Sequence, residues 1–150
     1  LERPREKFNF TYLPETVETL FREALSCFSS GCYNAFASMC RRTAQCAFAD
    51  LGEAGKLALY DELADIRRMA ELDDDSFQAA RKVIFDPDAP GRAELPLLEA
   101  FQAGVLLEVM KDLLYQAYVR RGRLQQAMMM RRYFAEESTD KVTPLPAARQ

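Results

Sequence analysis

The chain has 150 residues, of which 49% are hydrophobic and 29% charged, and it carries a net charge of −3. This length suits one domain with a substantial core, and no apolar run approaches the roughly 18 residues that a membrane-spanning helix needs. The acidic balance argues against a surface that coats nucleic acid, so the composition favours a soluble helical domain with no membrane partner.

The first predicted segment is an N-terminal arm over residues 1–12, which mixes charged and aromatic residues without a regular period. Its aromatic side chains, which need a surface to cover them, are Phe8, Phe10 and Tyr12. A helix is predicted from Pro14, because proline suits the first helical turn and acidic residues follow at the positive end of the helix dipole. Apolar residues then recur at helical spacing, and Ser29-Ser30-Gly31 ends the helix.

Three further helices are predicted in the middle of the chain. The first covers residues 32–51, where small and large apolar residues are mixed, and it is expected to be central. The second is an amphipathic stretch over residues 59–70. The third follows Asp73-Asp74-Asp75-Ser76, whose acids and hydroxyl are good first-turn and capping residues, and it reaches about Phe85. Residues 86–91 contain two prolines and a glycine and therefore form a loop.

The longest helix is predicted to begin at Pro96. Its apolar residues cover a wide arc, at Leu106, Leu107, Val109, Met110, Leu113, Leu114 and Ala117. Because this arc is wider than one core-facing stripe, it is expected to contribute to a homodimer interface. Arg121-Gly122-Arg123 is expected to form a bend, after which the chain is helical again to about Glu137. The remaining residues, 138–150, are expected to form a disordered tail.

Several short sequence runs resemble the opening helix pair of the HEPN-like superfamily, in the branch formed by the family of unknown function numbered 4145. These runs are Tyr12-Leu13-Pro14-Glu15, Arg22-Glu23-Ala24, Gly31-Cys32-Tyr33-Asn34-Ala35 and Arg41-Arg42-Thr43-Ala44-Gln45-Cys46. The similarity covers roughly residues 10–118. It implies an all-α antiparallel bundle of about five helices, here over residues 13–137, that is frequently a homodimer. Active members of the superfamily cut RNA with an arginine-to-histidine motif.

The catalytic part of that motif is incomplete in this chain. Arg81 stands at the matching arginine, but the sequence contains no histidine, and Ala89 occupies the position before Pro90 where the family has one. General acid–base attack on a ribose hydroxyl therefore lacks its usual agent. Asp86 and Asp88 are poor substitutes, because an exposed carboxylate keeps a low pKa. We therefore expect no catalytic residues and no RNase activity.

Charge is unevenly distributed along the chain. Residues 53–75 contain eight acids against three bases, whereas residues 119–134 contain five arginines and no acid. One interpretation is that the basic segment is a solvated face, or docks on the acidic one within a chain or across a dimer. The other is anion recognition, because arginine binds phosphate through two parallel hydrogen bonds and stacks on bases.

The anion hypothesis favours a nucleotide or cyclic dinucleotide over duplex DNA, because an acidic domain cannot make many phosphate contacts. Its candidate ligand-binding residues are Arg81, Arg120, Arg121, Arg123, Arg131 and Arg132. The chain would then be a non-catalytic regulatory or ligand-sensing module without a cofactor, since no phosphate-binding or dinucleotide motif is present. The alternative is a protein-interaction or assembly domain with no small ligand.

The cysteines and methionines are best explained structurally. Cys27, Cys32, Cys40 and Cys46 lack the paired short spacing of a zinc site, so they are expected to be core residues with free thiols. The three consecutive methionines at 128–130 cannot all face one core, so at least one should face elsewhere. Either the run fills the core and packs on a close neighbour, or it forms an adaptable apolar surface for a partner. Of Arg41 and Arg42, at least one is expected to be partly buried and paired with an acid. Free thiols, and the lack of a leader before Leu1, favour the cytoplasm.

Overall fold

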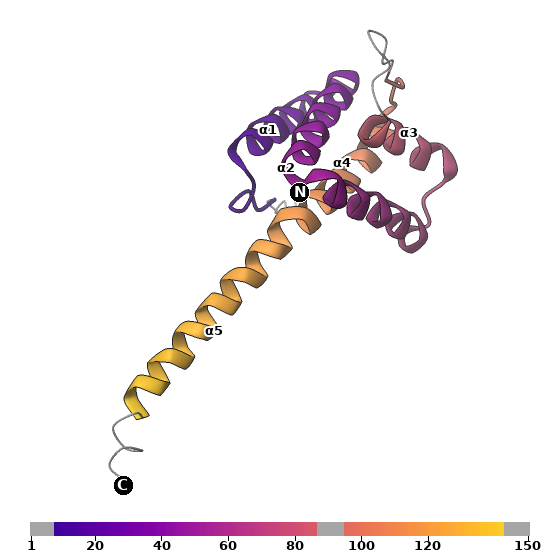
Figure 1. The fold of residues 1–150 in the computed structure, drawn as a ribbon. Helices are drawn as coiled ribbons and strands as arrows, with labels where there is room; N and C mark the ends of the chain where they lie inside the picture. The colour runs from indigo at the N-terminus through magenta and orange to yellow at the C-terminus, as the bar shows by residue number, and fades with distance from the viewer. Residues whose placement is uncertain (1–7, 87–94, 143–150) are drawn as a thin grey trace, which may run out of the picture.

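The computed structural model describes residues 8–86 and 95–142, with side chains to residue 138, and all regular structure in these stretches is helical (Figure 1). The elements in chain order are α1 (Glu15–Ser29), α2 (Tyr33–Ala70), α3 (Asp74–Phe85), α4 (Ala100–Leu114), the π-helical segment η1 (Tyr115–Val119) and α5 (Arg120–Val142). The predicted all-α class is confirmed.

Helices α1 to α4 form the body of the molecule and share one hydrophobic core (Figure 1). The largest side chains that are fully buried in it are Phe21, Phe36, Leu63, Leu106 and Met110. The apolar stripe predicted for α1 is confirmed at its centre, where Val17, Phe21 and Ala24 are buried. The aromatic arm is also covered as predicted over its described part, because the rings of Phe8 and Phe10 pack on the Phe21 ring.

Capping residues determine where α3 and α4 begin. Asp73 accepts a hydrogen bond from the backbone N–H of Ser76 at 2.9 Å, as the sequence predicted, and this bond lowers the pKa of Asp73. The start predicted for the long helix at Pro96 is wrong. That helix begins at Ala100, because Glu99 and Gln102 form a reciprocal capping box at its first turn.

Helix α2 is broken at Gly52. This residue has φ 81° and ψ −179°, a backbone conformation that only glycine adopts readily, and the chain changes direction there (Figure 1). The first half of α2 packs along α1, and the second half leads away toward α3. The sequence therefore predicted two separate helices correctly in this region, although the second begins directly after Gly52 and not near residue 59.

Helix α4, segment η1 and helix α5 form one continuous rod, and α5 projects out of the body (Figure 1). The predicted bend at residues 121–123 is wrong. Gly122 is helical. The Tyr12 ring of the arm lies directly against it, and a Cβ atom at this position would overlap that ring, so the contact requires a glycine. The helix also continues past the predicted end at Glu137 to Val142, while residues 143–150 of the predicted tail lie outside the described residues.

The projecting course of α5 changes the interpretation of the apolar arc. Leu106, Leu107, Val109, Met110, Leu113 and Leu114 are all buried within a single chain. The expectation that this arc is wide enough to require a partner is therefore wrong, because α2 and α3 already pack against α4. The part of the predicted bundle that follows residue 123 instead stands outside the body, and its large apolar side chains are exposed on α5.

Candidate functional site

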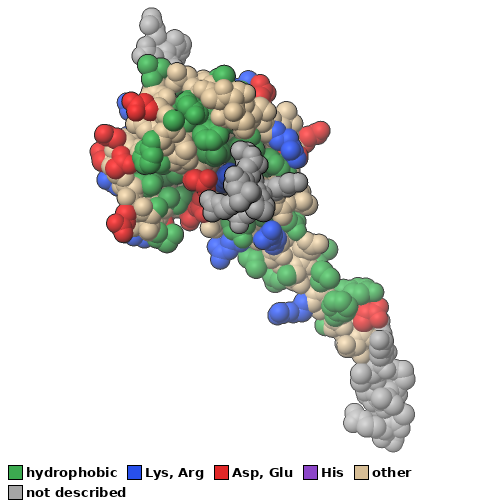
Figure 2. Space-filling model, turned by 180° about the vertical axis from the view of Figure 1, so that it is seen from behind, with side chains coloured by type: hydrophobic (Ala, Val, Ile, Leu, Met, Phe, Trp, Pro, Cys, Tyr) green, Lys and Arg blue, Asp and Glu red, His purple; other side chains and the backbone are tan. Residues whose placement is uncertain are grey.

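Helix α5 exposes large apolar side chains along its whole described length. Between 53% and 66% of the surface of each of six residues is exposed, namely Leu124, Met128, Met129, Met130, Tyr133 and Phe134. Figure 2 shows hydrophobic and basic side chains along this projecting helix. The prediction that part of the methionine run reaches the core is wrong, since all three methionines are exposed. Successive residues point about 100° apart, so these side chains surround the helix and do not form one stripe.

Five of the six arginines predicted to bind a ligand are exposed on α5, at Arg120, Arg121, Arg123, Arg131 and Arg132. The structure separates them into two sets. Three lie in the first turn of α5, and two lie roughly 15 Å further along the rod. Arg120 donates a hydrogen bond to Gln116 at 3.2 Å. Arg123 lines a hollow of about 550 Å³ together with Lys111 and Tyr115.

The base of α5 is braced by the N-terminal arm. Tyr12 packs against Gly122, and its hydroxyl donates a hydrogen bond to the side-chain oxygen of Gln126. Segment η1 is tied to α2, because the Tyr118 hydroxyl donates a hydrogen bond to Asp50 at 2.8 Å. Burial and this bond raise the pKa of Tyr118 above its usual range. The rod is therefore held at two points where it leaves the body, by the arm that precedes α1 and by helix α2.

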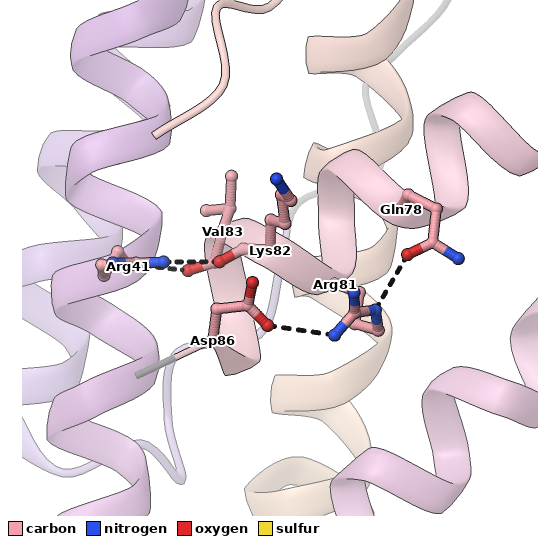
Figure 3. A network of polar contacts seen from close by, with 6 residues as sticks. All are labelled: Arg41, Gln78, Arg81, Lys82, Val83 and Asp86. Atoms are coloured by element: carbon pink, nitrogen blue, oxygen red, sulfur yellow. Dashed lines mark hydrogen bonds and ion pairs between the residues drawn. The ribbon is translucent and has the colours of Figure 1, made fainter. Parts of the chain in front are cut away.

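The sixth predicted arginine, Arg81, lies on α3, on the far side of the body from α5 (Figure 1). It donates hydrogen bonds to Gln78 and Asp86, both at 3.0 Å (Figure 3). The structure therefore does not group Arg81 with the arginines of α5. Asp86, one of the two carboxylates considered as a base, is engaged by this ion pair, and Asp88 lies outside the described residues.

Arg41 is a buried arginine that joins α2 to the end of α3. Its Nε donates a hydrogen bond to the carbonyl of Val83 at 3.0 Å, and its Nη2 donates to the carbonyl of Lys82 (Figure 3). Carbonyls in the last turn of a helix have no partner within the helix and attract positive charge. The predicted burial of one of the two adjacent arginines is confirmed by Arg41, and these bonds give it a structural role.

An acidic pair lies between α2 and α4, near the start of α5. Partial burial and contact with the Asp112 carboxyl raise the pKa of Glu62 from 4.5 to about 7, although nearby Arg120 acts in the opposite direction. The Oδ2 atom of Asp112 is itself buried and accepts no hydrogen bond from the described residues. A proton on Glu62 can form a hydrogen bond to this oxygen. Within the described structure, Glu62 is therefore a carboxyl that titrates near neutral pH.

A groove runs beside this acidic pair, between the second half of α2 and the helix α4. It has a volume of about 640 Å³, and we name it the α2–α4 groove; its lining residues include Ile66, Met69, Phe101, Gly104, Val105 and Asp112. Met69 is 76% exposed and Phe101 is 70% exposed, so large apolar side chains stand uncovered at its rim. Glu108 and Asp112 lie at the end nearest α5. The groove is thus apolar along its length and acidic at one end.

Sequence reasoning missed both the groove and the acidic pair. The groove brings residues 66–72 together with residues 100–112, and no local pattern reports that pairing. Met69 and Phe101 read as ordinary members of apolar stripes. For the acidic pair the sequence carried a signal at Glu62 alone, which lies in the acidic segment 53–75, whereas Asp112 lies outside both of the charged segments that were compared.

The four cysteines are free thiols with different exposures. Cys40 is buried as predicted, and burial raises the pKa of its thiol. The expectation is wrong for Cys32, which is exposed. Among residues 8–86 and 95–142, no three acidic or cysteine side chains lie together in a way that could hold a metal ion. No helix in these ranges combines the length and apolar character needed to cross a membrane.

Comparison of the chain with protein-family models, with curated proteins and with solved structures finds no match in any of the three. The HEPN-like resemblance and the homodimer it implies therefore stay predictions. The functional argument consequently depends on the residues and geometry described above.

Proposed function

We propose that this chain is a non-catalytic assembly module that works through protein–protein contact, with α5 as its contact element and a homodimer as its working form. The observation that carries the proposal is the exposure of six large apolar side chains on a helix that stands outside the body. Large contiguous apolar surface is uncommon on monomeric soluble proteins and marks interaction sites. Methionine and arginine, both abundant on α5, are enriched at such interfaces.

Sedimentation velocity of the natural chain over a range of concentrations tests this proposal. We expect a reversible monomer–dimer equilibrium. The double variant Met129→Glu, Met130→Glu should weaken it by about tenfold or more, because two apolar contacts become charged. Both side chains are exposed, so the variant should keep the helical spectrum of the natural chain. A natural chain that stays monomeric at every concentration, or a variant that associates equally well, contradicts the proposal.

The absence of catalysis is part of the same proposal. No histidine exists in the sequence, and Arg81 and Asp86 are paired with each other. Purified protein should leave structured and single-stranded RNA intact, as gel electrophoresis of the incubated RNA would report. Cleavage that disappears in an Arg81→Ala variant would instead support a HEPN-type RNase. We also propose a cytoplasmic location, because free thiols are typical of a reducing compartment.

A nucleotide-binding function is the second candidate, and one observation favours it. The hollow lined by Arg123 and Lys111 also has Phe8 and Tyr115 in its lining, so cations for phosphate and rings for base stacking occur together, beside the carboxylates of Glu108 and Asp112. Calorimetric titration with a cyclic dinucleotide tests it. Replacing Lys111 and Arg123 by alanine should weaken binding about a hundredfold if these two cations contact phosphate. No heat of binding from the natural chain rejects this candidate and leaves the assembly proposal standing.

A further inference from the structure

Two of the apolar surfaces that the described structure leaves uncovered could fit each other. One surrounds α5, and the other is the α2–α4 groove. We propose that the α2–α4 groove of one chain receives helix α5 of a second copy, and that the exchange is reciprocal. This inference rests on the proposed function, because it takes α5 as the contact element, and it adds the surface that α5 binds.

The continuity of the rod explains why the occupant comes from another chain. Helix α4 forms one wall of the groove, and α5 extends from the end of α4 in the same direction, away from the body (Figure 1). A helix cannot fold back onto the helix that it continues without a break, and the chain is helical throughout residues 100–142. Two rods placed antiparallel, with a twofold axis near η1, would set each α5 beside the other copy's α4.

The dimensions of the two surfaces agree. The groove follows α4 from Ala100 to Asp112, a distance of roughly 18 Å at the α-helical rise. The apolar stretch of α5 from Leu124 to Phe134 is roughly 15 Å long by the same measure. Gly104 lies in the wall of the groove, and a Cβ atom built on it would meet nothing within 4 Å. A second helix can therefore approach α4 closely at this point.

The charges of the two surfaces are complementary as well. The acidic end of the groove contains Glu108 and Asp112, with Glu62 in contact with Asp112. Helix α5 contains no acid from Arg120 to Phe134, and three of its five arginines there, Arg120, Arg121 and Arg123, lie in its first turn. In the antiparallel arrangement the arginines in the first turn of α5 would lie beside the acidic end of the groove. Matching of opposite charges also fixes the register and the choice of partner.

Variants of the groove test the inference in the full-length chain. Met69→Glu places a charge at the exposed rim, and Gly104→Leu adds a side chain to the wall of the groove at a position where a Cβ atom meets nothing within 4 Å. Each should raise the dimer dissociation constant, measured by sedimentation, by about tenfold or more. Leu57→Glu is the matched control, because Leu57 is also a large exposed residue of α2 but does not line the groove. It should change the constant by less than about twofold.

A mixing experiment separates this inference from the proposed function. A Gly104→Leu chain keeps its α5, and a Met129→Glu, Met130→Glu chain keeps its groove, so a mixture of the two can form one intact contact between α5 and the groove. Because neither variant alone can form that contact, the mixture should associate more tightly than either variant alone. If the groove variants dimerise normally but the α5 variant does not, α5 pairs elsewhere and the inference fails while the proposed function holds. If the natural chain never dimerises, both fail. Loss of dimerisation equally in the Leu57→Glu control also overturns the groove assignment.

Discussion

Arg41 is the residue on which the junction of α2 and α3 depends. Its guanidinium is buried and donates hydrogen bonds to two carbonyls in the last turn of α3. Replacing it by alanine should lower the free energy of unfolding by about 2–4 kcal/mol, because hydrogen bonds from a charged donor are lost and carbonyls are left buried. Urea denaturation measures this change. The neighbouring exposed Arg42 is the control, and Arg42→Ala should cost less than about 0.5 kcal/mol.

Glu62 should make stability depend on pH in a direction opposite to that of most acids. Its pKa is raised from 4.5 to about 7 in the folded chain, so the folded state holds this proton more tightly than the unfolded state. The free energy of unfolding should therefore fall as pH rises from about 4.5 to about 7. Urea titrations at both ends of that window measure the slope.

The variant Glu62→Gln should reduce that slope, since glutamine does not titrate. Asp61→Asn removes an exposed carboxyl one residue away and is the matched control. An unchanged slope in Glu62→Gln, or an equal loss of slope in the control, would contradict the assignment of the titration to Glu62.

Residue-level inference from the sequence succeeded where a local rule governs the residue. Capping was predicted within the run from Asp73 to Ser76, and the structure assigns the cap to Asp73, because a cap depends on residues only three positions away. The six candidate arginines could be named from the sequence, but which of them lie together could not be predicted. Arg81 and Arg120 lie in elements that the fold places far apart (Figure 1). The burial of Arg41 was anticipated, whereas its carbonyl partners depend on tertiary packing.

At the scale of the element, Gly52 decides the course of α2. Its φ of 81° with ψ of −179° belongs to a region that a residue with a Cβ atom avoids. Gly52→Ala should therefore destabilise the fold by about 1–3 kcal/mol, or straighten α2 at the expense of packing in the second half. Thermal unfolding followed by circular dichroism gives the sign and size of the change.

The control for that substitution is Gly104→Ala. Gly104 lies in the interior of α4 with open space at the Cβ position, so alanine should stabilise the chain by about 0.5–1 kcal/mol through its better helix propensity. Destabilisation of both variants by the same amount would contradict the conformational argument for Gly52.

Helix boundaries were predictable where the chain itself carries the stop signal. Ser29-Ser30-Gly31 and Asp73 are such signals, and the helices end and begin there. The predicted bend at Gly122 failed for a physical reason, since a glycine inside a helix can serve close packing as well as flexibility. Tyr12, more than a hundred residues earlier, is the side chain that Gly122 accommodates.

For the whole molecule, the separation of body and rod predicts the order of proteolysis. Trypsin cleaves after arginine and lysine, and α5 offers five exposed arginines outside the core. A dilute sample should therefore be cut first within residues 120–132, and a concentrated sample should be protected there if α5 is covered by a second copy. Mass spectrometry of the early fragments identifies the sites. First cleavage within the body helices α1 to α4 at both concentrations would contradict this order.

The rod also governs how the molecule moves through solution. Helix α5 has 23 residues and is therefore roughly 35 Å long. A single chain with such an extension has more hydrodynamic drag than a sphere of 17.1 kDa. On a sizing column the monomer should therefore elute early, near the volume expected of a compact dimer. When two chains pair with their rods antiparallel, the mass doubles but the drag increases less than it does when two compact proteins associate. The frictional ratio should consequently fall while the mass of the particle rises as the dimer forms.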